Sequence, residues 1–373
     1  IRMNHFFSNL FKREASPATG LTANKNADSG GYRQNIVYVN NSETAMKIAA
    51  VYRAVNLISS SAAVLTLQYK RLDRAKGYFK LHNTGDGAVI NYLLSVKPNG
   101  RMNSYTLIKN MVSIVLLQGN AYIYPVKNRR GVPEEFILCT PGSVTYDVYS
   151  NTYTIADMVN GISKTVDASE ILHFKNVCRD GGYVGISTIR YAALTLGIAA
   201  TADNETLKRF ATGGRFKAIL QNNQSVKGFG EYQDKQMEGM GEDLQESLNR
   251  GDDILSVRGD GTLTPISMSS SDMQFLENRK FTIREIARFF NVPPSKLMDD
   301  SNANYKSVEV SNIAFYAEAL QPIVTEIERE FAAKMLNINT YQDYKYKFDL
   351  KSLYALDLDS KAINPVWIMG RPV

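Results

Sequence analysis

Apolar side chains recur at spacings of three and four residues in five long stretches of this chain. Such spacing is typical of helices that bury one face and expose the other. The stretches are 42–65, 102–119, 187–210, 271–290 and 307–336. The sequence therefore predicts five long amphipathic helices, spread over most of the chain.

Residues with distinctive backbone preferences mark where these helices begin, end or bend. Ser42 is expected to cap the first helix, Gly119 to end the second and Gly213 the third. Pro293 lacks a backbone N–H and disfavours helical geometry at the preceding residue, so the fourth helix must end there. Pro322 lies inside the fifth apolar pattern, which predicts a kinked helix and not two separate ones.

A different pattern follows Gly119, where apolar and polar residues alternate from 120 to 155. Alternation broken by turn residues predicts antiparallel strands. The turn signals are Asn128 to Gly131, Pro141–Gly142 and Ser150–Asn151. Further short strands are predicted at 67–72 and 167–176. We expect one antiparallel sheet with a solvated face, so the first half of the chain is α+β.

The region between the third and fourth helices predicts a small unit of its own. A strand is expected at 216–220, a helix through 231–251, and a hairpin over 253–267 that turns at Gly259–Gly261. This unit would connect two long helices at their far ends.

Composition limits the class of protein. With 373 residues and 44% apolar residues, the chain can build a large core with an appended unit, or two domains. No apolar run approaches the ~18 residues that a membrane span needs, so we expect a soluble chain of intracellular origin. The net charge of +6 permits contact with nucleic acid without demonstrating it.

The sequence offers no convincing catalytic centre. Three histidines are scattered along the chain, and the two cysteines fit neither a disulfide framework nor a metal motif. His173 and Cys178 are five residues apart, but a core histidine and a core thiol explain them better than a nucleophile pair. The segment 185–189 resembles a nucleophile elbow but lacks its last glycine and its parallel strand. No catalytic residue, metal or cofactor is predicted.

Two alternative functions remain open at this point. Carboxylate pairs could hold a divalent ion in a metal-dependent DNA-processing enzyme, although each pair lies in a predicted turn or cap. These pairs are Glu134–Glu135, Asp252–Asp253, Asp299–Asp300 and Asp357/Asp359. Residues 1–40 are expected to be disordered. Within them, Phe6, Phe7, Leu10 and Phe11 could dock on a membrane or a partner.

Several motifs, in this order, resemble the portal proteins of tailed bacteriophages, in particular the compact branch typical of long-tailed phages. The matching stretches are "AVYRAVNLISSSAAVLTLQYKR" (50–71), "LLSVKPNGRMNSYTLIKNMVSIVLLQGNAYIY" (93–124), "GISTIRYAALTLGIAATADNETLKRFATGG" (185–214), "ENRKFTIREIARFFNVPPSKL" (277–297) and "ALQPIVTEIEREF" (319–331). The resemblance extends over about 40 to 358. It implies a ring, usually of twelve subunits, at one capsid vertex, through which double-stranded DNA enters and leaves.

The resemblance also implies a division of the chain into parts. An α+β wing would extend over 41–185, after the tail of 1–40. A stem helix (186–214) would lead to a small α/β clip (215–267), and a second stem helix (268–290) would return from it. A tunnel loop (291–306) would border the channel, followed by a kinked spine helix (307–338) that bends at Pro322. Residues 339–373 would form a C-terminal strand, the remnant of a crown and a tail.

The tunnel loop is the expected DNA-facing site. Its residues are Pro293, Pro294, Ser295, Lys296, Asp299, Asp300, Asn302, Asn304, Tyr305 and Lys306. Two lysines balance two aspartates, so the segment is neutral, whereas a loop that gripped DNA tightly would be basic. We hypothesise that Lys296 and Lys306 touch the duplex backbone without reading bases, while Asp299 and Asp300 keep the constriction from becoming adhesive.

The expected partners follow from the resemblance as well. They are further copies of the chain, double-stranded DNA, the terminase large subunit, the major capsid and scaffold proteins, and the neck or head-completion proteins, with no membrane. Acidic residues of the clip are candidates for docking the motor: Glu231, Asp234, Glu238, Glu242 and Asp243. The protein is expected in the virion at a capsid vertex, and in the host cytoplasm during assembly.

Overall fold

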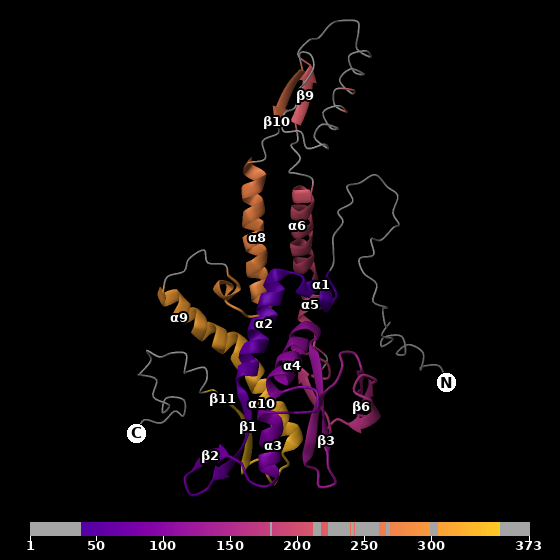
Figure 1. Cartoon of the computed structure of the whole chain (residues 1–373), viewed down its shortest axis with the longest axis vertical. Helices are drawn as coiled ribbons and strands as arrows, with labels where there is room; N and C mark the ends of the chain where they lie inside the picture. Colours follow the sequence, from indigo (N-terminus) through magenta and orange to yellow (C-terminus); the bar gives the residue numbers. More distant parts are fainter. Residues whose placement is uncertain are drawn as a thin grey trace, which may run out of the picture. The chain divides into compact units, whose positions relative to one another are not determined.

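The computed structural model describes residues 39–179, 181–211, 218–222, 239, 242, 261–265, 269–298 and 305–350. Helices and strands are mixed throughout this part of the chain (Figure 1). The α+β class predicted from the sequence is confirmed.

The first predicted helix is present as two helices. α1 (Ser42–Met46) is followed by α2 (Ala49–Val64), because the backbone is extended at Ile48. The expected cap is wrong by one residue: Asn41, not Ser42, accepts a hydrogen bond from the Glu43 N–H. The buried face of α2 packs against α4 (Ser104–Gln118), which ends at the left-handed Gly119 as predicted.

A three-stranded sheet follows α2, and its third strand comes from the far end of the chain. β1 (Thr66–Asp73) pairs with β2 (Tyr78–Leu81) on one side and with β11 (Tyr344–Asp349) on the other, all antiparallel. α3 (Asp86–Ser95) packs on β1, and its buried Asn91 side chain bonds to both backbone groups of Tyr69. Neither β2 nor α3 was predicted.

The single sheet expected after Gly119 is wrong, because the strands form two separate sheets. β3 (Asn120–Lys127) lies between β4 (Pro133–Leu138) and β8 (Leu172–Lys175). β5 (Val144–Asp147), β6 (Thr152–Asp157) and β7 (Ile162–Asp167) form the second sheet, with a small core of its own. β7 was missed because it is mostly polar and buries only Val166.

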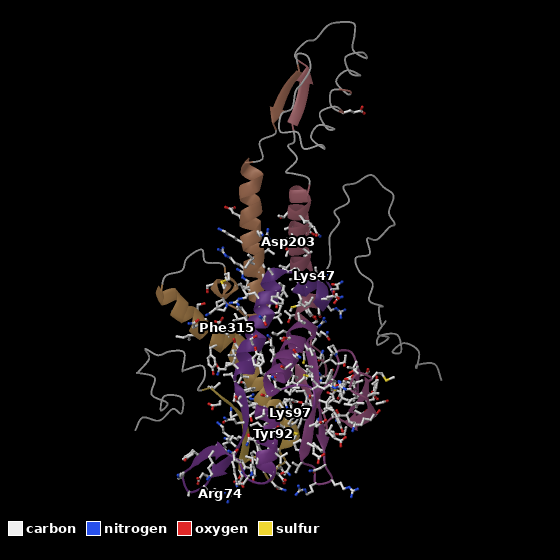
Figure 2. All side chains as sticks on the ribbon, in the orientation of Figure 1. Lys47, Arg74, Tyr92, Lys97, Asp203 and Phe315 are labelled. Carbon is white, nitrogen blue, oxygen red and sulfur yellow. The ribbon has the colours of Figure 1, made fainter. Side chains whose placement is uncertain are left out.

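Two long helices run side by side in Figure 1. α6 (Ala193–Ala211) is preceded by the short α5 (Thr188–Tyr191), so the predicted helix is interrupted at Ala192. α8 (Ser269–Phe289) packs along α6, and Asp203, labelled in Figure 2, forms an ion pair of 2.8 Å with Arg279.

Only part of the unit between these helices is described. β9 (Ala218–Asn222) pairs antiparallel with β10 (Gly261–Pro265). The predicted strand at 216–220 overlaps β9 at 218–220, and its first two residues lie outside the described part of the chain. The turn predicted at Gly259–Gly261 is wrong at Gly261, which is the first residue of β10. Gly239 and Glu242 are helical, as expected for 231–251, and the rest of that helix and the first half of the predicted hairpin lie outside the described residues.

The last predicted helix is continuous but not uniform. α9 (Tyr305–Ala314) passes into η2 (Phe315–Leu320), a π-helical segment, and then into α10 (Gln321–Met335). Pro322 stands directly after the π-helical segment, where a proline cannot donate to the helical ladder. The irregularity is therefore where the sequence predicts it, while a kink as such stays a prediction.

Aromatic side chains join α10 and β11 to the earlier strands in one core. Phe331 of α10 is fully buried, and its ring lies 5.6 Å from Phe136 of β4, 5.9 Å from Phe174 of β8 and 5.6 Å from Tyr346 of β11, centroid to centroid. α10 and β11 thus belong to the same folded body as the first sheets.

Candidate functional site

The candidate site is the connection from α8 to α9, which includes the segment predicted to border a channel. α8 ends through its own backbone before the prolines are reached. Asn291 adopts a left-handed conformation with φ 51°, and the Val292 N–H donates to the Ala287 carbonyl at 3.0 Å. This is the hydrogen-bond pattern of a left-handed helix cap. The asparagine, not only Pro293, was the signal for the helix end.

The first half of the connection is folded. η1 (Pro294–Leu297) is a single 3-10 turn in which the Lys296 N–H donates to the Pro293 carbonyl at 2.9 Å. Val292, before the turn, and Leu297, its last residue, are buried. The turn ends at Met298, which is left-handed and exposed. The pattern of prolines and polar residues did not predict this turn.

Side chains from two helices hold the turn in place. Arg53 of α2 donates from Nε to the Lys296 carbonyl at 3.3 Å. Ser295 and Ser311 of α9 share a hydrogen bond of 2.7 Å between their hydroxyl oxygens. The Lys296 ammonium donates to the Asn312 amide oxygen, also on α9. The ammonium group of Lys296 thus has a hydrogen-bond partner on α9.

The remaining predicted site residues are only partly described. Asp299, Asp300, Asn302 and Asn304 lie outside the described residues, as do Glu231, Asp234, Glu238 and Asp243 of the predicted clip. Tyr305 and Lys306 are the first helical residues of α9. Glu242 is exposed. Their roles in DNA contact and motor docking stay predictions.

The residues considered for catalysis have structural roles. His173 is only 2% exposed, and its ring nitrogens bond to the Tyr153 hydroxyl at 2.8 Å and to the Asn120 amide oxygen at 2.9 Å. Burial lowers the pKa of His173 to about 3, so the ring is neutral. The Cys178 thiol donates to the Asn176 carbonyl, and burial raises the pKa of Cys139 to about 12.

The segment resembling a nucleophile elbow is a helix start. The Ser187 hydroxyl donates to the Leu117 carbonyl at 2.6 Å and accepts from the Arg190 N–H at 3.2 Å, as a capping serine does. The strand before it, β8, pairs antiparallel with β3. Within the described ranges, no group of three or more His, Cys, Asp or Glu side chains could hold a metal ion.

Among the helices that the structure describes, none has the length and apolar character that crossing a bilayer requires.

Comparison with known proteins identifies a family and several relatives. The model of the phage portal protein family matches residues 49–364. The portal protein of Enterobacteria phage HK97 is 27% identical over 292 residues, which is 77% of this chain and 67% of that protein.

Solved structures share the fold. An HK97-family phage portal protein from Corynebacterium diphtheriae aligns with a TM-score of 0.58 at 19% identity, over 86% of this chain and 98% of that one. A chain in the neck of a native gene transfer agent particle, determined with C12 symmetry, aligns with a TM-score of 0.55 at 21% identity, over 89% and 94%.

Proposed function

This chain belongs to the phage portal protein family, and from that membership we propose that copies of it form a ring around a channel for double-stranded DNA at one capsid vertex. Twelve subunits are proposed, because the fold is shared with a chain in a particle neck of C12 symmetry. Portal proteins are structural, so the family implies that the chain is not an enzyme. We propose that a partner ATPase supplies the energy for DNA movement.

The observation that best supports a ring is that α5 and α6 have apolar side chains on more than one side. One face of these helices is buried within the subunit through Ala192, Leu196 and Ala199. The large apolar side chains of the opposite face, Tyr191, Leu194 and Ile198, are 54% to 55% exposed. Leu207, further along α6, is 67% exposed, and Phe281 of the adjacent α8 is 58% exposed. Large apolar side chains that gather at exposed positions mark an interaction surface, which favours coverage by neighbouring subunits.

A charged residue in this exposed apolar face should prevent assembly. Ile198→Asp places a carboxylate where the ring would exclude water, so we expect rings to be lost while the subunit stays folded. Electron microscopy and the mass in solution measure assembly, and far-ultraviolet circular dichroism measures folding. Asn204→Asp adds the same charge to an exposed polar position of α6 and should assemble normally. Rings of equal abundance from both variants would argue against this interface.

Within the ring, we propose that α6 and α8 form the stem, which leads to a clip at 215–267, and that the sheets, together with α10 and β11, form the wing. The connection after η1 would border the channel. Its anchor on α2, α8 and α9 supports this role, since a segment that touches moving DNA needs a fixed base. In this arrangement Lys296 would contact the DNA backbone from a defined position.

The balance of charge in this connection is proposed to let DNA slide. Asp299→Lys together with Asp300→Lys turns a neutral segment strongly basic, and we expect DNA to be retained in rings more strongly and with a steeper dependence on salt. Retention of linear duplex between about 50 and 200 mM salt measures this effect. The double variant with Asp299→Asn and Asp300→Asn makes half the charge change. Its DNA retention should therefore lie between that of the unaltered protein and that of the double lysine variant. Equal retention in all three proteins would rule out an electrostatic role.

The partners follow from the same proposal. The terminase large subunit and later the neck or head-completion proteins would dock at the clip, where Glu231, Asp234, Glu238, Glu242 and Asp243 offer acidic groups. The major capsid and scaffold proteins would surround the wing. The ring would be assembled in the host cytoplasm and retained in the virion.

A further inference from the structure

The sheet formed by β2, β1 and β11 carries two lysines directly opposite each other on neighbouring strands. Lys70 of β1 is paired in register with Lys345 of β11. Side chains of such cross-strand partners stand on the same face, with Cβ atoms about 5 Å apart, and like charges in these positions destabilise a sheet. The pairing therefore costs stability unless something negative lies over it.

Both lysines belong to the face of the sheet that is opposite to its buried aromatic residues. Tyr69, Tyr346 and Phe348 alternate with the lysines along their strands and pack into the core. The Lys345 ammonium lies 4.2 Å from the centroid of the Phe79 ring of β2. Because β1 separates β11 from β2, the Lys345 side chain must cross β1 close to Lys70. Two lysine side chains thus share one sheet face.

The acidic groups near this face are engaged with other donors. Glu328 of α10 accepts from the Phe348 N–H at 2.9 Å and pairs with Lys347. Asp349 accepts from the Gln68 amide at 3.3 Å. Asp343, directly before β11, forms an ion pair with Arg74 of the β1–β2 turn, which is labelled in Figure 2. Within the described part of the chain, Lys70 and Lys345 form no ion pair with a carboxylate.

We propose that this lysine face, defined by Lys70 and Lys345, binds the phosphate backbone of double-stranded DNA outside the channel. Their Cβ atoms are about 5 Å apart as cross-strand partners, and a DNA strand carries one phosphate per ~3.4 Å of helix axis, so the two flexible side chains can each reach a phosphate. The contact would be independent of sequence, because ammonium groups on a flat sheet reach phosphates and not base edges.

The place of the sheet in the fold indicates which DNA it would meet. β1 begins at the C-terminal end of α2, whereas η1 is anchored by Arg53, near the N-terminal end of that helix. The sheet and the α8 end are therefore separated along α2, which is about 24 Å long at about 1.5 Å per residue. This step rests on the proposed function: with stem and clip directed outward, the lysine face lies on the side of the packaged genome.

Closed circular DNA separates this site from the channel, because it cannot thread a ring that is already assembled. We expect preassembled rings of the full chain to bind relaxed circular plasmid at about 50 mM salt. The double variant K70Q/K345Q should bind at least about tenfold more weakly and lower the slope of log K against log salt, by about 0.9 for each phosphate that is no longer neutralised. Gel mobility and sedimentation at about 50 to 200 mM salt measure both quantities.

The matched control is K47Q/K164Q, which removes the same charge from two exposed lysines, Lys47 directly after α1 and Lys164 of β7. It should bind within about twofold of the unaltered protein, since non-specific affinity follows the phosphates actually contacted. Thermal unfolding adds a second criterion: removing the like-charge pair should leave the Tm of K70Q/K345Q equal to or above that of the unaltered chain.

Three results would overturn the inference. In the first, unaltered rings do not bind circular plasmid at about 50 mM salt. In the second, K70Q/K345Q binds plasmid as tightly as the control K47Q/K164Q. In the third, K70Q/K345Q binds plasmid normally but no longer binds an acidic protein partner. Electron microscopy of the same samples keeps the two proposals apart. If K70Q/K345Q forms rings and binds plasmid as the unaltered protein does, only the proposed role of the lysine face is contradicted. If the unaltered protein forms no rings, the proposed function is contradicted.

Discussion

Gly119→Ala is expected to lower the free energy of unfolding by about 2 to 5 kcal/mol, the sum of a left-handed backbone cost of ~1–2 and an overpacking cost of ~1–3. Gly119 has φ 84°, and an added Cβ would lie 2.4 Å from the carbonyl carbon and 2.5 Å from the carbonyl oxygen of Ile186. These are backbone atoms, so no side chain can rotate away. Chemical denaturation measures the loss.

Gly142→Ala is the matched control, because Gly142 has the same φ of 84° but no atom within 4 Å of an added Cβ. It carries the backbone cost alone, about 1–2 kcal/mol. The difference between the two variants therefore isolates the close contact. If both variants lost the same stability, the contact with Ile186 would not be a constraint on the fold.

The contact is important because it fixes where the α5–α6 segment leaves the sheets. An added Cβ on Gly185 would lie 2.1 Å from the Gly119 carbonyl oxygen, which already accepts from the Asn176 N–H at 2.9 Å. The Asn120 side chain bonds to both backbone groups of Gly185. Two glycines and one asparagine thus join segments far apart in sequence, at the junction between the proposed wing and the proposed stem.

Stability should fall with decreasing pH because of His173. Its pKa is lowered by burial to about 3, from 6.5 in an unfolded chain. Below pH 6.5 the unfolded state takes up a proton that the folded state refuses, so each pH unit costs about 1.4 kcal/mol. Between about pH 6.5 and 5 the loss should reach about 2 kcal/mol. Unfolding free energies measured at intervals from about pH 7.5 down to about pH 5 test this slope.

His173→Gln separates this effect from those of other titrating groups. Glutamine keeps hydrogen-bonding capacity towards Tyr153 and Asn120 but does not titrate. The pKa of His82 is also lowered, by burial and by Arg71, so it acts in the same direction and remains in the variant.

The carboxylates act mainly at lower pH. Burial raises the pKa of Glu330, so its protonation in the folded state partly offsets the loss as the pH falls. Hydrogen bonds lower the pKa of Asp147 and Asp167, whose contributions are lost only towards pH 3.8 and below. A slope in His173→Gln equal to that of the unaltered chain would contradict the assignment.

Local patterns were sufficient for much of the fold. Apolar spacing located α2, α4, α6, α8 and α10, and alternation located β3, β4 and β6, because helix and strand each impose their own period on a buried face. Gly119 and Pro322 marked a helix end and a helical irregularity, because these residues change which backbone conformations are accessible. The motifs that resemble portal proteins agree with the family match over 49–364.

Other features depend on contacts between segments that are distant in sequence. The sequence contained no sign that β11 would pair with β1 or that the strands after Gly119 would separate into two sheets. Nor did it show that the His173 ring would bond to Tyr153 and Asn120 while its backbone N–H donates to Glu330. The 3-10 turn at 294–297 also depends on Arg53, more than two hundred residues away.

What the sequence by itself determined is therefore the set of helices and most strands, the main helix ends and the family, since these depend on the period and backbone freedom of neighbouring residues. The tertiary structure decided the strand partners, the buried histidine, the Gly119–Gly185 junction and the opposed lysines of β1 and β11. These require residues from opposite ends of the chain to meet, as Lys70 and Lys345 do. Local propensity does not determine contacts between residues that are distant in sequence. These contacts depend on the packing of the whole core.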